Sequence, residues 1–379
     1  MHKKPRFALT LAATGIAATA ASAQENVIVY RLGRDTVAIE QYTRTNSRLT
    51  GELVSRTGFA VQRIQYDFTL ANGRPIAATV KAMRPDGTPF PNLPSEWRFT
   101  FRRDSAIREA VFKDSTSRRA FAASNAFPEL PVFAYGYTEL LAAMGRGKRD
   151  SVPSIGLGGG NVGYLGLETL AGDTLRLRGG EYAMRFTFDR NGRLVSMDGL
   201  LTENKAVGTR APAKVDMGAI ASAMRPTGML SPRQTAFASI ANGPIMVNYG
   251  SPAARGRTVW GGILIPFDTI WRTGANEATH LATSKRIQLG DITVDPGLYT
   301  LWTQHTRTGT FLIVNKQVGQ WGTQYNPANN LGRLAMQLSD APSFVENFTI
   351  TIRPLGQGRG AIDLAWGDKV ASAPFVVRP

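Results

Sequence analysis

The sequence predicts an all-β protein built from two β-rich domains. Many short runs alternate apolar and polar residues with a period of two, which places successive side chains on opposite faces of a strand. Glycine, proline and asparagine separate these runs, and only two short stretches are predicted to form helices. The chain has 379 residues and no cysteine, so it is long enough for two hydrophobic cores and contains no disulfide.

The predicted N-terminal domain, residues 24–205, shows the clearest alternation at residues 97–102 (WRFTFR), with the aromatic residues on one face. Residues 175–178 and 184–188 repeat the pattern, and Asn191-Gly192 after them predicts a β-hairpin turn. A helix is predicted over residues 137–144. We expect this domain to form a curved sheet, a sandwich or a partial barrel.

The composition changes at residues 206–235, which are rich in glycine, proline and alanine and poor in aromatic residues. Asp216 is placed to cap a short helix over residues 217–224, and Pro226 ends it. This stretch is predicted to be a linker with a short helix. Short strands return in residues 236–379, at 245–249, 299–302, 311–314 and 348–352, which indicates an antiparallel β-sandwich.

Residues 1–23 have the three parts of a secretory signal peptide. Lys3, Lys4 and Arg6 form a basic start, residues 7–20 are apolar, and Ala21-Ser22-Ala23 matches a cleavage site. We expect cleavage near Ala23 and a mature chain in the periplasm or outside the cell. No later stretch is long and apolar enough to predict a transmembrane segment.

The charge balance is basic, with 44 Lys and Arg against 28 Asp and Glu and a net charge of +16. Such a balance favours an anionic or hydroxylated ligand of the cell envelope, and export argues against nucleic acid as a partner. A glycine-rich loop at residues 156–163 (GLGGGNVG) fits neither phosphate-binding pattern. We therefore expect no cofactor, and the sequence leaves the oligomeric state open.

A long specific string lies at residues 271–279 (WRTGANEAT), after YGSP at residues 249–252 and WGG at residues 260–262. Through these motifs the C-terminal region, about residues 236–379, resembles the exported bacterial family called domain of unknown function 2911. The resemblance implies no activity and no catalytic residue, and His280 and His305 are not part of the family pattern. It does not cover the N-terminal domain.

The candidate ligand site is the segment that contains this string. Its polar groups can orient a ligand and its tryptophans can supply a stacking face. In the alternative interpretation, which we favour, Arg272 pairs with Glu277, other polar groups bond to the backbone, and the tryptophans fill the core. The candidate residues are Arg257, Trp260, Trp271, Arg272, Asn276, Glu277 and Thr279.

No reaction is indicated by the sequence. There is no cysteine nucleophile and no G-x-S-x-G motif. His280 and His305 are expected to be solvent-exposed rather than metal ligands with Glu277. The leading hypothesis is a non-catalytic envelope or secreted binding module for a small or polymeric ligand. The alternatives are a hydrolase acting on envelope or extracellular material and a carrier of an apolar ligand in the N-terminal domain.

Overall fold

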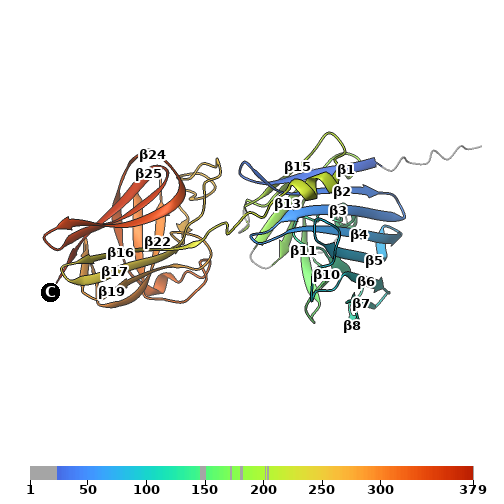
Figure 1. The fold of residues 1–379 in the computed structure, drawn as a ribbon, viewed down its shortest axis with the longest axis horizontal. Helices are drawn as coiled ribbons and strands as arrows, with labels where there is room; N and C mark the ends of the chain where they lie inside the picture. Colours follow the sequence, from blue (N-terminus) through green and yellow to red (C-terminus); the bar gives the residue numbers. More distant parts are fainter. Residues whose placement is uncertain are drawn as a thin grey trace, which may run out of the picture.

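The computed structural model of the chain describes residues 24–145, 151–170, 173–179, 182–200, 202 and 205–378. The signal peptide predicted over residues 1–23 lies outside these residues. Two β domains lie side by side along the long axis, and one stretch of chain joins them (Figure 1). The all-β prediction is confirmed, because the described secondary structure is nearly all strand. None of the described helices has the length and apolar character needed to cross a bilayer.

The N-terminal sheet has fifteen strands in the order β8-β7-β6-β5-β4-β3-β2-β1-β15-β14-β13-β12-β11-β10-β9. Neighbouring strands of this sheet pair antiparallel, apart from β9 and β10, which pair parallel. Its strands are β1 (Gln24–Leu32), β2 (Asp35–Arg44), β3 (Arg48–Arg56), β4 (Val61–Ala71), β5 (Arg74–Met83), β6 (Glu96–Phe101), β7 (Ser105–Val111), β8 (Thr116–Ala122), β9 (Phe127–Glu129), β10 (Ser151–Gly156), β11 (Gly163–Leu170), β12 (Thr174–Gly179), β13 (Tyr182–Phe188), β14 (Leu194–Asp198) and β15 (Val207–Arg210).

The period of two that predicts these strands sorts their side chains between the two faces of the sheet. In β6, Trp97, Phe99 and Phe101 are buried while Arg98 and Thr100 are exposed. The predicted Asn191-Gly192 hairpin joins β13 to β14, and Gly192 has the positive φ of 70° that this turn requires. One face of the sheet therefore carries a continuous aromatic core and the other faces outwards.

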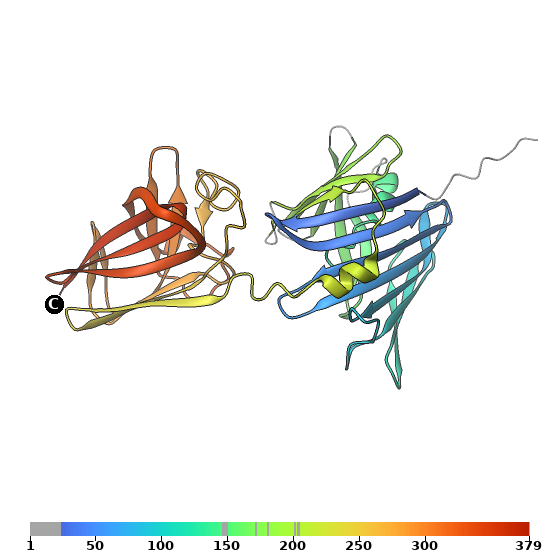
Figure 2. The ribbon, with the colours of Figure 1, turned by 45° about the horizontal axis from the view of Figure 1, so that its top comes forward.

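The core face of the sheet is covered by an inserted segment, residues 130–144, which contains most of helix α1 (Thr138–Gly145). The sheet curves around this segment (Figure 2). A buried carboxylate, Glu40 of β2, holds it in place: Oε1 accepts from Tyr66 Oη at 2.7 Å and from Gly136 N at 2.9 Å. Oε2 accepts from Tyr30 Oη at 2.8 Å and from Tyr135 N at 3.0 Å.

Helix α2 (Met217–Ala223) packs on the outer face of the same sheet. As predicted, Asp216 caps it by accepting a hydrogen bond from Ala219 N at 3.0 Å. Its buried residue Met217 lies in a small cluster with Val54 and Val61 of β3 and β4. Together with β15, this helix places residues 207–223 of the predicted linker on the N-terminal sheet.

The C-terminal sheet follows the order β16-β17-β19-β22-β23-β24-β25-β20-β21, with β18 paired to β22. A 3₁₀-helix, η1 (Pro327–Asn329), precedes β24. The strands are β16 (Arg233–Ile240), β17 (Gly243–Gly250), β18 (Ile270–Trp271), β19 (Thr279–Thr283), β20 (Ile287–Leu289), β21 (Ile292–Val294), β22 (Gly297–His305), β23 (Thr310–Asn315), β24 (Asn330–Gly356) and β25 (Arg359–Val377).

The long β24–β25 hairpin gives this domain its second layer. Its register shifts between Asp340 and Thr349, and beyond that point it lies over β16 and β17 (Figure 1). Phe348 and Trp366 of the hairpin share one core with Val247 of β17 and other strands below. This is the antiparallel sandwich that the many short strands in residues 236–379 predict.

The two domains also touch through the β1–β2 turn. Arg34 N donates to Arg255 O at 3.0 Å, and the Arg255 guanidinium forms an ion pair with Asp35. Gly33 has a φ of 61°, and a Cβ atom added to it would lie 2.2 Å from Arg255 O. This position therefore requires glycine, and the contact brings the N-terminal domain against the loop that precedes the predicted site.

Candidate functional site

The predicted site segment is held together mainly by its own hydrogen bonds. Trp271 is buried, stacks on Trp366 at 5.7 Å between ring centroids, and donates from Nε1 to Gly274 O at 3.1 Å. Thr279 is fully buried and donates from Oγ1 to Thr273 O at 2.7 Å. Both side chains face the core of the sandwich rather than solvent, as the structural interpretation predicts.

The predicted ion pair between Arg272 and Glu277 is wrong. Among the described residues the ion partner of Glu277 is Arg233, at 3.6 Å, while Arg272 donates from Nη1 to Asn276 O at 3.0 Å. Asn276 has a positive φ of 62°, and its carbonyl takes the position beside Arg272 that the Glu277 carboxylate was expected to take. The same carbonyl accepts from Gly322 N at 2.9 Å, so Arg272 and Asn276 join this segment to the next loop.

Glu277→Ala is therefore expected to change the free energy of unfolding by less than about 1 kcal/mol. The carboxylate is half exposed and pairs with an arginine near the surface, and such pairs contribute little. Urea unfolding of the variant beside the wild type measures this difference. A loss of several kcal/mol would show instead that Glu277 holds a buried pair.

The remaining two candidates lie at the edges of the sandwich. Trp260 is partly buried and donates from Nε1 to Trp366 O at 2.8 Å. Arg257 donates to Ala254 O and Ala253 O, both at 2.9 Å. Burial lowers the pKa of Lys205 in the N-terminal domain, and the charges of Arg272 and Arg257 lower it further. Two of the predicted arginines thus approach a lysine of the other domain.

The expectation of solvent-exposed histidines is wrong for His305, which is buried. Its ring lies between Phe267, at 5.0 Å, and Trp260, at 5.4 Å, and Nδ1 bonds to Thr310 Oγ1 at 2.8 Å. His280 is half-buried, and its Nε2 accepts from Gly319 N at 3.0 Å. In the part of the chain that the structure describes, no three His, Asp or Glu side chains are grouped to hold a metal ion.

The glycine-rich loop presents carbonyl oxygens rather than amide groups to its neighbour. The Arg108 guanidinium donates to Gly156 O at 2.6 Å, to Gly158 O at 2.7 Å and to Gly159 O at 2.8 Å. A phosphate-binding loop needs amide groups that point at the anion. The carbonyl oxygens of this loop bind a cation, the Arg108 guanidinium, rather than an anion.

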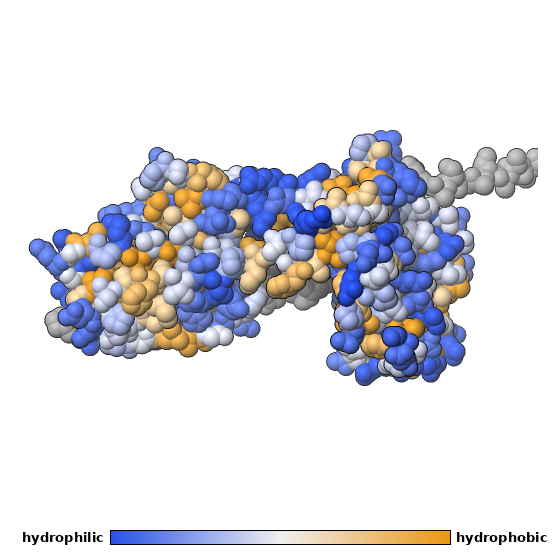
Figure 3. Space-filling model, viewed as in Figure 1, coloured by the Kyte–Doolittle hydropathy of each residue, from blue (hydrophilic) through white to orange (hydrophobic). Residues whose placement is uncertain are grey.

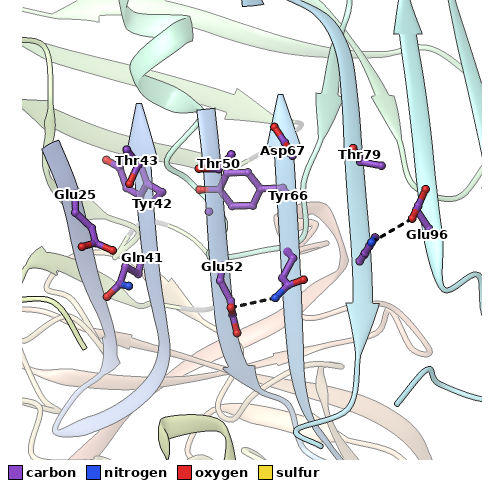
Figure 4. A pocket seen from close by; sticks show the side chains of 13 residues that line it. Glu25, Gln41, Tyr42, Thr43, Thr50, Glu52, Tyr66, Asp67, Thr79 and Glu96 are labelled. Atoms are coloured by element: carbon purple, nitrogen blue, oxygen red, sulfur yellow. Dashed lines mark hydrogen bonds and ion pairs between the residues drawn. The ribbon is translucent and has the colours of Figure 1, made fainter. Parts of the chain in front are cut away.

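A broad hollow of about 610 Å³ lies on the outer face of β1–β6, on the same face as α2. We call it the outer hollow. Figure 4 shows its labelled side chains spread over adjacent strands, and the surface around it is mostly hydrophilic in Figure 3. Its lining consists of Glu25, Gln41, Tyr42, Thr43, Thr50, Gly51, Glu52, Gln65, Tyr66, Asp67, Thr79, Lys81 and Glu96.

The outward side chains of the hollow form two rows that cross the strands (Figure 4). The strand register places them opposite one another, and neighbouring strands lie about 4.8 Å apart. The first row is Glu25, Thr43, Thr50, Asp67 and Thr79. The second row is Gln41, Glu52, Gln65, Lys81 and Glu96.

The carboxylates of the outer hollow are held in place by neighbouring cations. Glu52 pairs with Arg63 at 2.6 Å and also accepts from Gln65 Nε2 at 3.2 Å. Glu25 lies 3.2 Å from Lys214, which precedes α2. The other pairs are Asp67 with Arg48, and Glu96 with Lys81 and Arg98. The hollow therefore presents carboxylate acceptors that each have a cationic neighbour.

The threonines of the outer hollow have unused hydrogen-bonding capacity. Thr43, Thr50 and Thr79 make no side-chain hydrogen bond to any residue that the structure describes. Each hydroxyl can donate one hydrogen bond and accept others. Thr43 and Thr50 lie next to each other between Glu25 and Asp67, and Thr79 follows Asp67, so the first row contains both hydroxyl groups and carboxylates.

The sequence prediction missed this hollow because no local motif marks it. Its members come from six strands, and only the meander order of those strands brings them together. A signal does exist in pairs of polar residues two apart, such as Gln41 with Thr43 and Thr50 with Glu52. These pairs mark the exposed face of a strand, but they give no indication that the face is hollow.

Two further cavities lie in the N-terminal domain. One, of about 300 Å³, lies beside α1 and is lined by Arg44 and Glu139 among others. The other, of about 630 Å³, lies between the loop at residues 84–95 and the β7–β8 turn, and Phe90, Leu93 and Phe112 form its apolar part. The cavity beside α1 is the one with buried charged groups.

The comparisons with known proteins cover the C-terminal domain alone. No curated protein and no solved structure matches the chain. The N-terminal part matches no family model. Residues 231–375 match the model of a family described as "Protein of unknown function (DUF2911)", so the C-terminal region has the family resemblance that the string at residues 271–279 predicts.

Proposed function

We propose that this protein is a non-catalytic binding module of the cell envelope or the extracellular space. In this proposal its ligand is a neutral, hydroxylated polymer such as a glycan, and its site is the outer hollow. The observation that carries the proposal is the pair of polar rows that line a hollow of about 610 Å³. The basic, apolar and cleavage-site parts of residues 1–23 support export.

The chemistry of the rows suits a ligand with many hydroxyl groups. An ionised carboxylate offers about four acceptor positions, so Glu52 keeps free capacity beyond its bonds to Arg63 and Gln65. Each sugar hydroxyl both donates and accepts, as do Thr43 and Thr50 on the neighbouring strands. Glu52 and Arg63 are both about one-fifth exposed, so this acceptor loses little further freedom when a ligand binds.

The charge of the lining favours neutral ligands over anionic ones. Four carboxylates, those of Glu25, Glu52, Asp67 and Glu96, line the hollow together with one cation, Lys81. The cations that pair with the other three carboxylates, Arg48, Arg63 and Lys214, lie outside the lining, so the surface that a ligand would contact carries more acceptors than cations. Of the anionic and hydroxylated ligands that the sequence suggests, this site favours a neutral hydroxylated one.

The hydrolase alternative needs a different arrangement of the same groups. Glycoside hydrolysis uses one carboxyl group to donate a proton and a second as nucleophile or base. In the outer hollow each carboxylate lies against a guanidinium or ammonium group. Such a carboxylate is suited to accepting hydrogen bonds, which supports binding rather than hydrolysis.

Thr50→Trp is expected to abolish binding of neutral oligosaccharides, because the indole fills the middle of the first row. Aromatic residues are favoured in strands, so the variant should keep its fold. Isothermal titration of the full-length protein with cellohexaose, maltohexaose and chitohexaose measures the effect. The wild type should bind at least one of them.

Asp340→Asn serves as the matched control, since Asp340 is an exposed carboxylate paired with Lys369 in the other domain. It should bind as the wild type does, whereas Glu52→Gln should bind several-fold more weakly. The proposal fails if no neutral oligosaccharide binds the wild type. It also fails if the Thr50→Trp variant binds with unchanged affinity.

A further inference from the structure

A second cavity, separate from the outer hollow, lies on the inner side of the N-terminal sheet. It has a volume of about 300 Å³ and lies between α1, β12 and the turn at residues 189–192. This volume is at the lower end of the range for small-molecule sites, about 300–1,000 Å³. Its lining includes both charged groups and apolar side chains.

The floor of the cavity is a buried charge cluster around Glu139 of α1. Its Oε1 accepts from Tyr42 Oη and from Leu194 N at 2.9 Å. Its Oε2 has no hydrogen-bond partner among the described residues, although Arg44 Nε lies 3.2 Å away and Arg193 Nε 3.3 Å away. Two guanidinium groups thus lie beside one buried carboxylate oxygen.

Arg44 is the member of this cluster that faces the cavity. Its Nε is turned towards Glu139, and its Nη2 lies beside Gly192 in the cavity lining. No described residue accepts a hydrogen bond from its Nη atoms, and its side chain is 21% exposed. When one edge of a guanidinium is held in place, its other N–H groups can donate two parallel hydrogen bonds to a carboxylate.

One part of the cavity wall is apolar. Leu175 of β12 and Phe188 of β13 are buried beside it, and Ala142 and Ala143 of α1 complete the wall. Arg190 and Asp173 also line the cavity and add one charge of each sign. The cavity thus places the guanidinium of Arg44 near an apolar part of the wall.

We propose that this cavity binds a small carboxylic acid, with its carboxylate on Arg44 and its hydrocarbon part against Leu175 and Phe188. The proposal goes beyond the glycan site, because Arg44 does not line the outer hollow. It assigns the N-terminal domain two ligands of different chemistry. Glu139 acts in it as a positioning residue that fixes Arg44.

The test is isothermal titration of the full-length protein with hexanoate and, as a neutral comparison, hexan-1-ol. We expect saturable binding of hexanoate and none of the alcohol. Arg44→Gln should weaken hexanoate binding at least about tenfold, because a charge-assisted hydrogen bond contributes about 1.5–3 kcal/mol. Ala143→Trp fills the chamber without touching the charge cluster and should abolish binding even where Arg44→Gln disturbs folding.

Arg185→Gln is the control, since Arg185 is an exposed arginine of β13 outside the cavity lining. It should bind hexanoate as the wild type does. The proposal is overturned if the wild type does not bind hexanoate, if hexan-1-ol binds equally well, or if both cavity variants bind normally. Oligosaccharide binding should survive in Arg44→Gln, so failure of one site is distinguishable from failure of the other.

Discussion

Glu40→Ala is expected to lower the free energy of unfolding by at least about 3 kcal/mol. The change removes the acceptor of two phenol O–H groups and two backbone N–H groups inside the sheet, and each buried donor left unpaired costs about 1–3 kcal/mol. Urea unfolding of the full-length protein measures the loss. A loss below about 1 kcal/mol would contradict the view that Glu40 holds the inserted segment.

The same carboxyl group should make stability depend on pH. Burial raises the pKa of Glu40 from 4.5 to about 7, and the four hydrogen bonds offset only part of that rise. The folded state therefore holds a proton more tightly than the unfolded state. Its contribution to stability is present below pH 4.5 and is lost as the pH rises to 7, by about 3 kcal/mol in total.

Glu40→Gln isolates this contribution, because glutamine keeps the shape and cannot ionise. The unfolding free energy of the wild type should fall relative to that of Glu40→Gln as the pH rises through this window. Glu25→Gln, at a surface carboxylate, is the control and should follow the wild-type profile. Parallel profiles for wild type and Glu40→Gln would rule out a raised pKa at this site.

Trp271→Ala is expected to cost about 3–5 kcal/mol of stability, the range for removing a large aromatic side chain from a core. Trp271 stacks on Trp366 and makes an edge contact with Phe348 at 4.9 Å between centroids. The result distinguishes the two interpretations of the site segment. A ligand-stacking tryptophan at the surface could be removed with little loss of stability.

Trp321→Ala is the matched control for this prediction. Trp321 lies in the same domain but is 38% exposed, so its removal should cost much less. Thermal and urea unfolding of both variants give the comparison. If Trp271→Ala proved as stable as the wild type, the string at residues 271–279 would be better explained as a ligand site.

Local patterns predicted much of the fold because they act over a few residues. Alternation placed the aromatic residues of β6 on one face, Asp216 capped α2, and Asn191-Gly192 formed its hairpin. Each depends on backbone geometry or on a side chain within about four residues. The inserted segment could not be predicted in this way, because Tyr135 and Gly136 bond to Glu40. These two residues follow Glu40 by 95 and 96 positions in the chain.

Contacts between residues far apart in the sequence also explain why the candidate site was predicted less well than the fold. Local sequence indicated that the Thr279 side chain bonds to the backbone, but it chose the wrong ion partner for Glu277. The true partner, Arg233, comes from a strand 44 residues earlier. The outer hollow depends on the order and curvature of whole strands, a property that no short stretch contains.

Hydrogen exchange measured by mass spectrometry tests the central claim, that ligand binding takes place on the N-terminal sheet. The full-length protein would be compared with and without the oligosaccharide that binds it most tightly. We predict slower exchange in peptides from residues 41–81, which form most of the outer hollow. Slower exchange confined to residues 257–279 of the C-terminal domain would contradict the account.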